Sequence, residues 1–199
     1  MRPHWMLLEQ GLEYEFHPIG SRTGETMTPE FLALNPRHKI PVLRHGSFVI
    51  SESAAILQYL GEAFPLPADW YAPRDAIGRA RLQEWCFFIM TELDASSMYV
   101  VRRHLGLKHL YGEAPAAVES GRRYFCENLE AMAPRIGASG YLMGDRFSAA
   151  DILLTTCLDW ALADGISLSR SAIGYRERTI RRPAYRAAFE RNFPEFKRG

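Results

Sequence analysis

The chain has 199 residues, of which 47% are hydrophobic, and this is enough for one large or two small folded domains. Lysine and arginine number 24, and aspartate and glutamate number 23, so the net charge of +1 gives no sign of a nucleic-acid or membrane partner. No apolar run approaches the roughly 20 residues that a transmembrane helix needs.

The N-terminal third begins with a predicted helix over residues 2–11. Pro3 suits the first turn of a helix, and Gly11 suits the position just after its C-terminus. Residues 14–19, Tyr-Glu-Phe-His-Pro-Ile, predict a strand. A short helix follows, with the Thr28 hydroxyl as its predicted N-terminal cap.

The stretch over residues 35–60 carries more specific chemistry than the rest of the chain. Pro41 stands directly before an apolar run, and a proline, which lacks an N–H, belongs at the first residue of a strand or on an edge. The peptide bond before Pro41 is therefore at a turn-to-strand junction and is a candidate for the cis form. Residues 44–47 then predict a hairpin turn, and residues 48–50 the returning strand.

A helix is predicted after that strand, because Ser51-Glu52-Ser53 leads into apolar residues at helical spacing, and a serine at such a start is a good cap. The free N–H groups at this helix N-terminus favour a bound carboxylate. Lys39 supplies a second anion contact, and Glu52 offers an acceptor for an ammonium group. A small ligand with two separated carboxylates and one amine fits all three features.

These residues resemble the glutathione-binding half of a cytosolic glutathione S-transferase, of the bacterial type. The resemblance rests on the distance from Pro41 to Glu52 and on three short motifs: Asn35-Pro36, Lys39-Ile40-Pro41-Val42-Leu43 and Glu52-Ser53-Ala54. It implies a thioredoxin-like N-terminal domain followed by an all-helical domain, glutathione as co-substrate, no metal, and a homodimer. A thioredoxin-like hairpin and helix without this ligand is the alternative.

The resemblance assigns roles to six residues of this chain. Lys39, together with His38, would meet the glycyl carboxylate of glutathione. The backbone of Ile40, held by Pro41, would pair with the cysteinyl main chain. Glu52 and Ser53 would hold the γ-glutamyl end. The joint presence of Lys39, Glu52 and Ser53 favours binding over the ligand-free alternative.

One departure from the family concerns the N-terminus. Members of the family begin with a strand and a loop that carries the Ser, Tyr or Cys which activates the glutathione sulfur, whereas here a helix begins at residue 2 or 3. We expect Met1 to be an internal methionine of a longer protein; completion by another chain and a degenerate domain are the alternatives. No catalytic residue of the family can be named in this chain, and Arg2 is the fallback positive charge near the sulfur.

Residues 66–73 contain two prolines and an aspartate, and predict a linker between a thioredoxin-like domain over residues 1–65 and a helical domain over residues 74–199. The helical domain opens with a long apolar pattern over residues 75–105, in which Ile77 begins the predicted core stripe.

In the family, the helix equivalent to residues 75–105 lines the electrophile pocket and the dimer interface. Three residues near its C-terminal end are therefore candidates for a second-substrate site: Tyr99, Arg102 and Arg103. A solvated basic face beside a core stripe is the alternative.

The remaining elements are a turn over residues 108–112, a second long helix over residues 114–136, and a last helix that opens at Pro183. Ser148 and Asp151 have the spacing of a capping box before an apolar helix. The same box recurs in the second domain of the family, so we assign Asp151 a folding role and no catalytic one.

The three cysteines, Cys86, Cys126 and Cys157, are far apart and form no metal-binding spacing, and the six histidines are dispersed. A reducing cytoplasm is the simplest compartment for such a chain. The leading prediction is an enzyme that adds the glutathione thiol to a hydrophobic electrophile. A non-catalytic binding or scaffold protein, or a glutathione-dependent isomerase, dehalogenase or reductase, are the alternatives.

Overall fold

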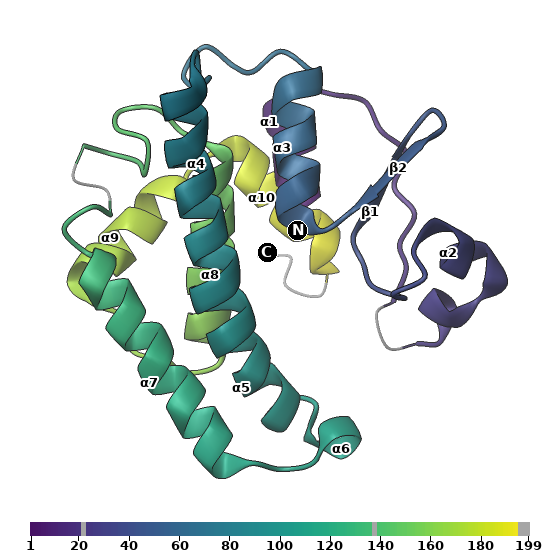
Figure 1. Cartoon of the computed structure of the whole chain (residues 1–199), viewed down its shortest axis with the longest axis vertical. Coiled ribbons are helices and arrows are strands. Elements are labelled where there is room, and N and C mark those ends of the chain that lie inside the picture. Colours follow the sequence, from purple (N-terminus) through teal and green to yellow (C-terminus); the bar gives the residue numbers. More distant parts are fainter. Residues whose placement is uncertain (21–22, 137–138, 195–199) are drawn as a thin grey trace. The chain divides into compact units, whose positions relative to one another are not determined.

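The computed structural model describes residues 1–20, 23–136 and 139–194 (Figure 1). The chain forms two compact units. The first contains Met1–Pro67 together with the chain from Ala187 onward, and the second contains Ala68–Arg186.

The first unit combines a β-hairpin with helices that lie on both sides of it in the sequence. Its elements are α1 (Arg2–Glu9), η1 (Glu25–Met27), α2 (Pro29–Leu34), β1 (Val42–His45), β2 (Phe48–Ser51) and α3 (Ser53–Ala63), with the C-terminal part of α10 (Pro183–Asn192). The core lies between α1 and α3, where Trp5, Ile56 and Leu57 are fully buried.

The predicted helix near the N-terminus is confirmed, and its end has a defined geometry. Gly11 adopts a φ of 63°, a left-handed conformation that glycine enters without steric cost. Its N–H bonds the Leu8 carbonyl at 3.2 Å, and the N–H of Leu12 bonds the Leu7 carbonyl at 3.0 Å. These two bonds form a Schellman motif, which satisfies carbonyl groups that the helix leaves open.

The predicted hairpin is confirmed, with a tighter turn than expected. β1 and β2 are antiparallel, with Val42 opposite Ser51 and His45 opposite Phe48. Only Gly46 and Ser47 form the turn, and Gly46 has a φ of 60°. This suits a two-residue hairpin turn, whose twist matches that of the strands.

The predicted strand over residues 14–19 is wrong, because these residues form no ladder. Among the described residues the sheet consists of β1 and β2 alone. A strand forms only where a neighbour accepts and donates its backbone hydrogen bonds, and the composition of a segment cannot supply that neighbour. The segment is instead a coil, in which Tyr14 accepts a hydrogen bond of 2.6 Å from Arg191.

The two predicted helix caps of this unit have different outcomes. The Thr28 hydroxyl accepts the N–H of Phe31 at 3.3 Å, which confirms the cap of α2. The predicted serine cap of α3 is wrong, because Glu52 occupies the cap position and its side chain makes no capping bond. Ser51 is already paired in β2 and Ser53 is already helical, so neither hydroxyl is placed to cap.

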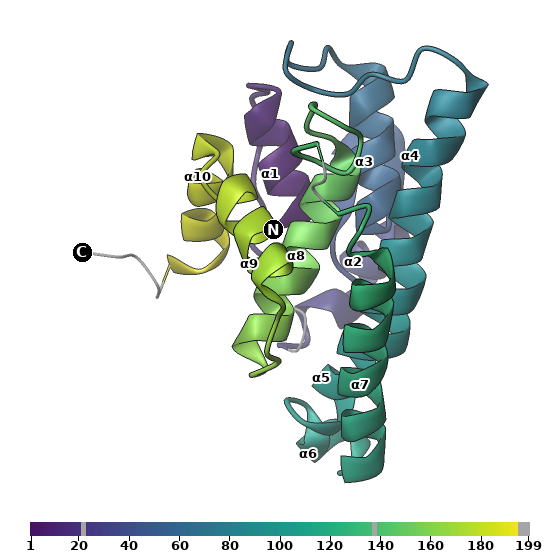
Figure 2. The same ribbon diagram turned by 90° about the vertical axis from the view of Figure 1, so that its left-hand side faces the viewer.

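The second unit is helical. Its elements are α4 (Ala76–Phe88), η2 (Ile89–Met98), α5 (Tyr99–His104), α6 (Lys108–Tyr111), α7 (Pro115–Met132), α8 (Ala149–Ala163) and α9 (Arg170–Thr179), with the start of α10. Figures 1 and 2 show α7 running beside the continuous run of α4, η2 and α5, and α8 packs against α4, η2 and α9. No helix of the described ranges is both long enough and apolar enough to span a bilayer.

The long predicted helix over residues 75–105 is confirmed, but its middle part, η2, is a π-helix. The Asp75 carboxylate caps its start by accepting the Gly78 N–H at 2.7 Å. Ile77 was placed wrongly in the core stripe, since it is 68% exposed. Gly78 is the inward residue at this end, and a side chain there would collide with the Tyr71 hydroxyl.

Two further boundaries differ from the sequence pattern. The predicted turn over residues 108–112 contains the single helical turn of α6. The second long helix ends at Met132, four residues before the predicted residue 136.

The predicted capping box at the start of α8 is confirmed. Asp151 is completely buried, and its carboxylate accepts the N–H of Ser148 at 2.8 Å, the N–H of Leu142 at 2.9 Å, and the hydroxyls of Ser148 and Tyr175. Burial raises the pKa of the Asp151 carboxyl, while these donors act in the opposite direction. Through these four hydrogen bonds the Asp151 carboxylate connects the start of α8, the preceding loop and α9.

We expect Asp151→Asn to lower the free energy of unfolding by about 3 kcal/mol, because an amide cannot accept from all four donors and leaves buried N–H or O–H groups unpaired. Urea unfolding followed by circular dichroism measures the change. Asp145→Asn is the control, because Asp145 is exposed in the same loop. Equal stability of the two variants would contradict the structural role of Asp151.

His4 provides a pH-dependent contribution to stability. Its ring lies edge-on to Phe16 with a centroid distance of 4.4 Å, and burial, followed by the positive charges of the N-terminal amino group and of Arg191, lowers the pKa of His4 to about 4. A histidine whose pKa is lowered in the folded state stabilises it above its ordinary pKa of 6.5, and the stabilisation is lost as the pH falls toward 4.

We therefore expect the unaltered chain to lose more stability than His4→Gln between pH 7 and pH 4.5, by on the order of 1 kcal/mol, since the ring is only half-buried and partly screened by solvent. Urea midpoints at both pH values test this. The exposed His109, changed to Gln, is the control. A pH dependence that His4→Gln leaves unchanged would contradict the prediction.

Candidate functional site

The hairpin brings the two halves of the predicted site to one end. Val42 is the first residue of β1 and lies opposite Ser51, the last residue of β2. Pro41 and Glu52 are the next residues outward on the two strands, so both lie at the end of the hairpin where α3 begins. The Ile40-Pro41 peptide bond is cis, as predicted from the sequence.

The loop that leads to Pro41 is held by the side chain of Asn35, which is only 4% exposed. Its amide nitrogen donates to the Lys39 carbonyl at 2.8 Å, and its amide oxygen accepts the Arg37 N–H at 3.1 Å. The backbone carbonyl of Asn35 accepts the His38 N–H at 2.9 Å. One buried side chain therefore positions the backbone on which the two predicted anion contacts, His38 and Lys39, are carried.

Two residues of the site adopt left-handed backbone conformations that are uncommon for side chains other than glycine. His38 has a φ of 46° and Glu52 a φ of 68°. Such conformations persist where the surroundings impose them, and they concentrate at ligand sites. Both residues were assigned to ligand binding from the sequence.

Arg37 joins the two sides of the site, and sequence reasoning missed it. Its Nη1 lies 2.5 Å from Oε1 of Glu52, and both side chains are exposed. An exposed ion pair stabilises the fold by at most about 1 kcal/mol, so its main effect is to fix where the Glu52 carboxylate lies. The position of Arg37 between two motif residues, Asn35 and Lys39, is the only sequence signal for it.

The N-terminus of α3 forms the second half of the site. Ser53, its first residue, is 8% exposed, and Nη1 of Arg2 donates to Ser53 Oγ at 3.2 Å. The first N–H groups of a helix have no intrahelical acceptor, and here the Glu52 side chain does not cap them. Backbone donors, a hydroxyl and a guanidinium thus converge where a carboxylate binds well.

The residues assigned to a second substrate lie on α5 in the second unit. The guanidinium of Arg103 lies 5.3 Å from the ring centre of Tyr99 and 5.0 Å from that of Tyr111. The guanidinium of Arg102 lies 5.6 Å from the ring centre of Trp160. These cation–π contacts order both arginines on aromatic surfaces. Their part in substrate binding stays a prediction.

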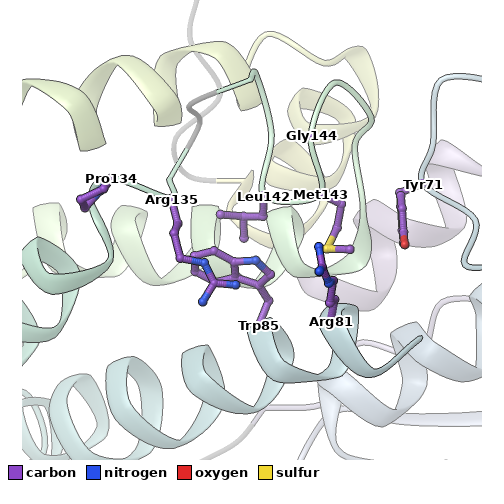
Figure 3. Close-up of a pocket in the computed structure, with 8 residues that line it drawn as sticks. All are labelled: Tyr71, Arg81, Trp85, Pro134, Arg135, Leu142, Met143 and Gly144. Atoms are coloured by element: carbon purple, nitrogen blue, oxygen red, sulfur yellow. The ribbon is translucent and has the colours of Figure 1, made fainter. Parts of the chain in front are cut away.

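A cavity of about 510 Å³ lies elsewhere in the second unit (Figure 3). The Arg135 guanidinium covers the Trp85 ring at 4.7 Å and bonds Glu84 at 3.0 Å. None of the three residues assigned to the second substrate lines this cavity, which is formed by Tyr71, Arg81, Trp85, Pro134, Arg135, Leu142, Met143 and Gly144.

Cys86 and Cys157 are buried and Cys126 is partly exposed, and none of the three forms a disulfide among the described residues. Burial, followed by the negative charges of Glu130 and Glu127, raises the pKa of the Cys126 thiol, which disfavours the nucleophilic thiolate. In the described part of the chain, no group of three or more His, Cys, Asp or Glu side chains could hold a metal ion.

Two family models match the chain. The model described as glutathione S-transferase, N-terminal domain, matches residues 1–63, and the model described as glutathione S-transferase, C-terminal domain, matches residues 88–183.

Relatives by sequence carry the same description. Glutathione S-transferase theta-1 of Rattus norvegicus is 26% identical over 74% of this chain and 62% of its own length. Glutathione S-transferase 3 of Zea mays is 32% identical over 73% of this chain and 66% of its own length. The chain thus spans 62% and 66% of the length of these two relatives.

Solved structures match over almost the whole chain. A glutathione transferase from Methylococcus capsulatus is 31% identical, with a TM-score of 0.79, over 96% of this chain and 92% of that one. The glutathione transferase URE2P8 of Phanerochaete chrysosporium, solved with oxidized glutathione, has a TM-score of 0.85 at 21% identity, over 100% of this chain and 91% of that one. These matches confirm the predicted fold, a thioredoxin-like N-terminal domain followed by a helical domain.

Proposed function

This chain belongs to the glutathione S-transferase family, and we propose that it binds reduced glutathione and transfers its thiol to an electrophilic small molecule. The observation that carries the proposal is the convergence of the Lys39–Pro41 segment and the α3 N-terminus at one end of the hairpin. Glutathione has carboxylates at both ends and an ammonium group at one of them, and this end of the hairpin offers donors and an acceptor for each.

The proposed binding mode assigns one part of glutathione to each element. Lys39, with His38 beside it, meets the glycyl carboxylate. The backbone of Ile40, set by the cis bond to Pro41, pairs with the cysteinyl main chain. Glu52 accepts the ammonium group, and Ser53 with the N–H groups of α3 binds the γ-glutamyl carboxylate.

The proposed reaction needs the glutathione thiol in its thiolate form. The thiolate sulfur attacks the electrophilic carbon, a carbon–sulfur bond forms, and the leaving group departs with its bonding electrons or an unsaturated carbon takes up the pair. We assign no residue of this chain to the activation of the sulfur. For the electrophile we propose Tyr99, Arg102 and Arg103 on α5, because the Tyr99 ring offers an aromatic surface and the two guanidinium groups can donate hydrogen bonds to negatively polarised substituents of the substrate.

We further propose that the protein works in the reducing cytoplasm, where conjugation to glutathione detoxifies electrophiles. Three cysteines that form no disulfide among the described residues suit that compartment. We also propose a homodimer. Ile77 and Phe87 on α4 are 68% and 62% exposed, and apolar side chains of this size are stabilised when a second copy of the chain covers them.

We expect reduced glutathione to give saturable heat in a calorimetric titration of the 199-residue chain, and Lys39→Ala and Ser53→Ala to weaken binding about tenfold each, as the loss of one charge-assisted hydrogen bond would. Arg44→Ala is the control, because Arg44 is exposed on β1 and its replacement removes one positive charge, as Lys39→Ala does. Unchanged affinity in both site variants would reject the proposed binding mode. Turnover of an activated aryl chloride tests the transfer step separately.

We expect Phe87→Asp to shift the chain from dimer to monomer, raising the dimer dissociation constant about tenfold or more, because a buried charge replaces an apolar contact. Static light scattering across a concentration series measures this. Leu110→Asp is the control, since Leu110 is 53% exposed on α6. If the unaltered chain has the mass of a monomer at all concentrations, the dimer proposal is wrong.

A further inference from the structure

The cavity in the second unit has the size of a small-molecule site, because its volume of about 510 Å³ falls within the roughly 300–1,000 Å³ that such sites occupy (Figure 3). Its walls come from segments that are distant in the sequence, and include Arg81 and Trp85 on α4, Pro134 and Arg135 after α7, and Leu142–Gly144 before α8. None of the residues assigned to glutathione or to the electrophile lines it. The cavity is therefore a candidate for a different ligand.

Arg135 gives the cavity hydrogen-bond donors in a fixed position. Its guanidinium covers the Trp85 ring at 4.7 Å and bonds the two carboxylate oxygens of Glu84 at 3.0 and 3.3 Å. A guanidinium has five N–H donors, and this pair uses only two of them. Because the Glu84 carboxylate offsets its charge, Arg135 contributes directed donors more than net charge.

Arg81 supplies the charge that is left over. It is exposed, and in the part of the chain that the structure describes its guanidinium has no hydrogen-bond or ion-pair partner. The pKa of the Glu84 carboxyl is lowered first by the hydrogen bond from Arg135 and only last by the charge of Arg81, so Glu84 is the partner of Arg135. No carboxylate lines the cavity within the described ranges. Two arginines and one glutamate thus leave a single positive charge at its wall.

Tyr71 adds a hydroxyl to the same cavity. Its backbone N–H bonds the Phe147 carbonyl at 2.7 Å, and its hydroxyl lies over Gly78, where an added side-chain carbon would come within 2.6 Å of the oxygen. The tyrosine is half-buried, and among the described residues its hydroxyl has no hydrogen-bond partner. A tyrosine hydroxyl that is withdrawn from solvent usually finds such a partner, so a ligand oxygen suits this position.

The rest of the wall is apolar. Trp85 and Leu142 are only 3% and 7% exposed, and Met143 is half-buried. A methionine thioether adapts its shape and makes favourable contacts with aromatic rings. Figure 3 shows the Arg81 side chain extending from α4 toward Met143, so the surplus charge lies beside apolar surface. This combination favours an acidic group joined to an aromatic body.

We propose that the cavity binds an aromatic monocarboxylate, with the carboxylate on Arg81 and the Tyr71 hydroxyl, and the rings against Met143. The single surplus charge matches a carboxylate, whereas a phosphate monoester carries about −1.5 to −2. Leu142 in the same wall is tied to the start of α8, because its N–H bonds the Asp151 carboxylate at 2.9 Å. A bound carboxylate therefore joins α4 to this loop and stabilises the second unit.

The experiment uses calorimetry with biphenyl-4-carboxylate, and with biphenyl-4-carboxamide and biphenyl-4-yl phosphate as matched probes. The variants are Arg81→Met, Arg81→Lys and Tyr71→Phe. Arg79→Met is the matched control, because Arg79 is an exposed arginine of the same helix and does not line the cavity. Arg102→Met detects binding at the proposed electrophile site instead.

We expect saturable binding of biphenyl-4-carboxylate with a dissociation constant of about 1 mM or tighter, which is ordinary efficiency for a ligand of this size. Arg81→Met should weaken it about tenfold and Tyr71→Phe about threefold, as the loss of a charged and of a neutral hydrogen bond would. Arg81→Lys should keep part of the affinity, since lysine retains the charge without the planar fork. Arg79→Met and Arg102→Met should bind as the unaltered chain does.

The probes give the second half of the test. The carboxamide should bind the unaltered chain about tenfold more weakly than the carboxylate, and Arg81→Met should remove this difference. Thermal unfolding should shift to higher temperature with the carboxylate, and less so in Arg81→Met.

Four results would overturn the proposal. Equal weakening by Arg79→Met and Arg81→Met would show general attraction to a basic helix. Weakening by Arg102→Met alone would place the carboxylate at the proposed electrophile site. Tighter binding of the phosphate than of the carboxylate would contradict the assigned ligand class. Equal affinity for carboxylate and carboxamide, or no saturable heat with either, would leave the cavity without a carboxylate site.

Discussion

The antiparallel pairing of Val42 with Ser51 determines where every residue of the candidate site lies. Side chains alternate between the faces of a strand, so a slip of one residue would turn Pro41 to the opposite face and move it away from Glu52 and the start of α3. The two-residue turn at Gly46 and Ser47 prevents that slip, because its length fixes the register. A short hairpin thereby sets the distance between the Lys39–Pro41 segment and the N-terminus of α3, the two halves of the proposed glutathione site.

The sequence predicted helix ends and turns correctly where the interactions that form them join residues close together in the chain. The proline, glycine and capping residues of α1, α2 and α8 act on backbone groups only a few residues away, and the Thr28 cap and the Ser148–Asp151 box are found as predicted. α8 also ends as α1 does: Gly165 has a φ of 75°, and the N–H of Ile166 bonds the Ala161 carbonyl at 2.9 Å. The hairpin and the cis bond at Pro41 were predictable for the same reason.

The failures arise where a tertiary partner decides the outcome. Residues 14–19 have the composition of a strand, but a ladder needs a neighbouring strand, which no pattern within the segment can reveal. Ile77 has the right spacing for the core, yet Gly78 and the Tyr71 hydroxyl occupy the inward side of that helix turn. Ser51 and Ser53 both match a cap, and only the register of β2 shows that neither stands at the cap position.

The candidate site shows the same division. Its residue types were visible in the sequence because Lys39, Pro41, Glu52 and Ser53 lie in short motifs. The two arginines that bond to these side chains were not visible, since Arg2 contacts Ser53 across 51 positions of sequence and Arg37 contacts Glu52 across 15. Arg2 donates to the Ser53 hydroxyl, and Arg37 pairs with the Glu52 carboxylate. The motif around Glu52 and Ser53 therefore describes only part of the surroundings of the α3 N-terminus, because the guanidinium that bonds Ser53 belongs to α1.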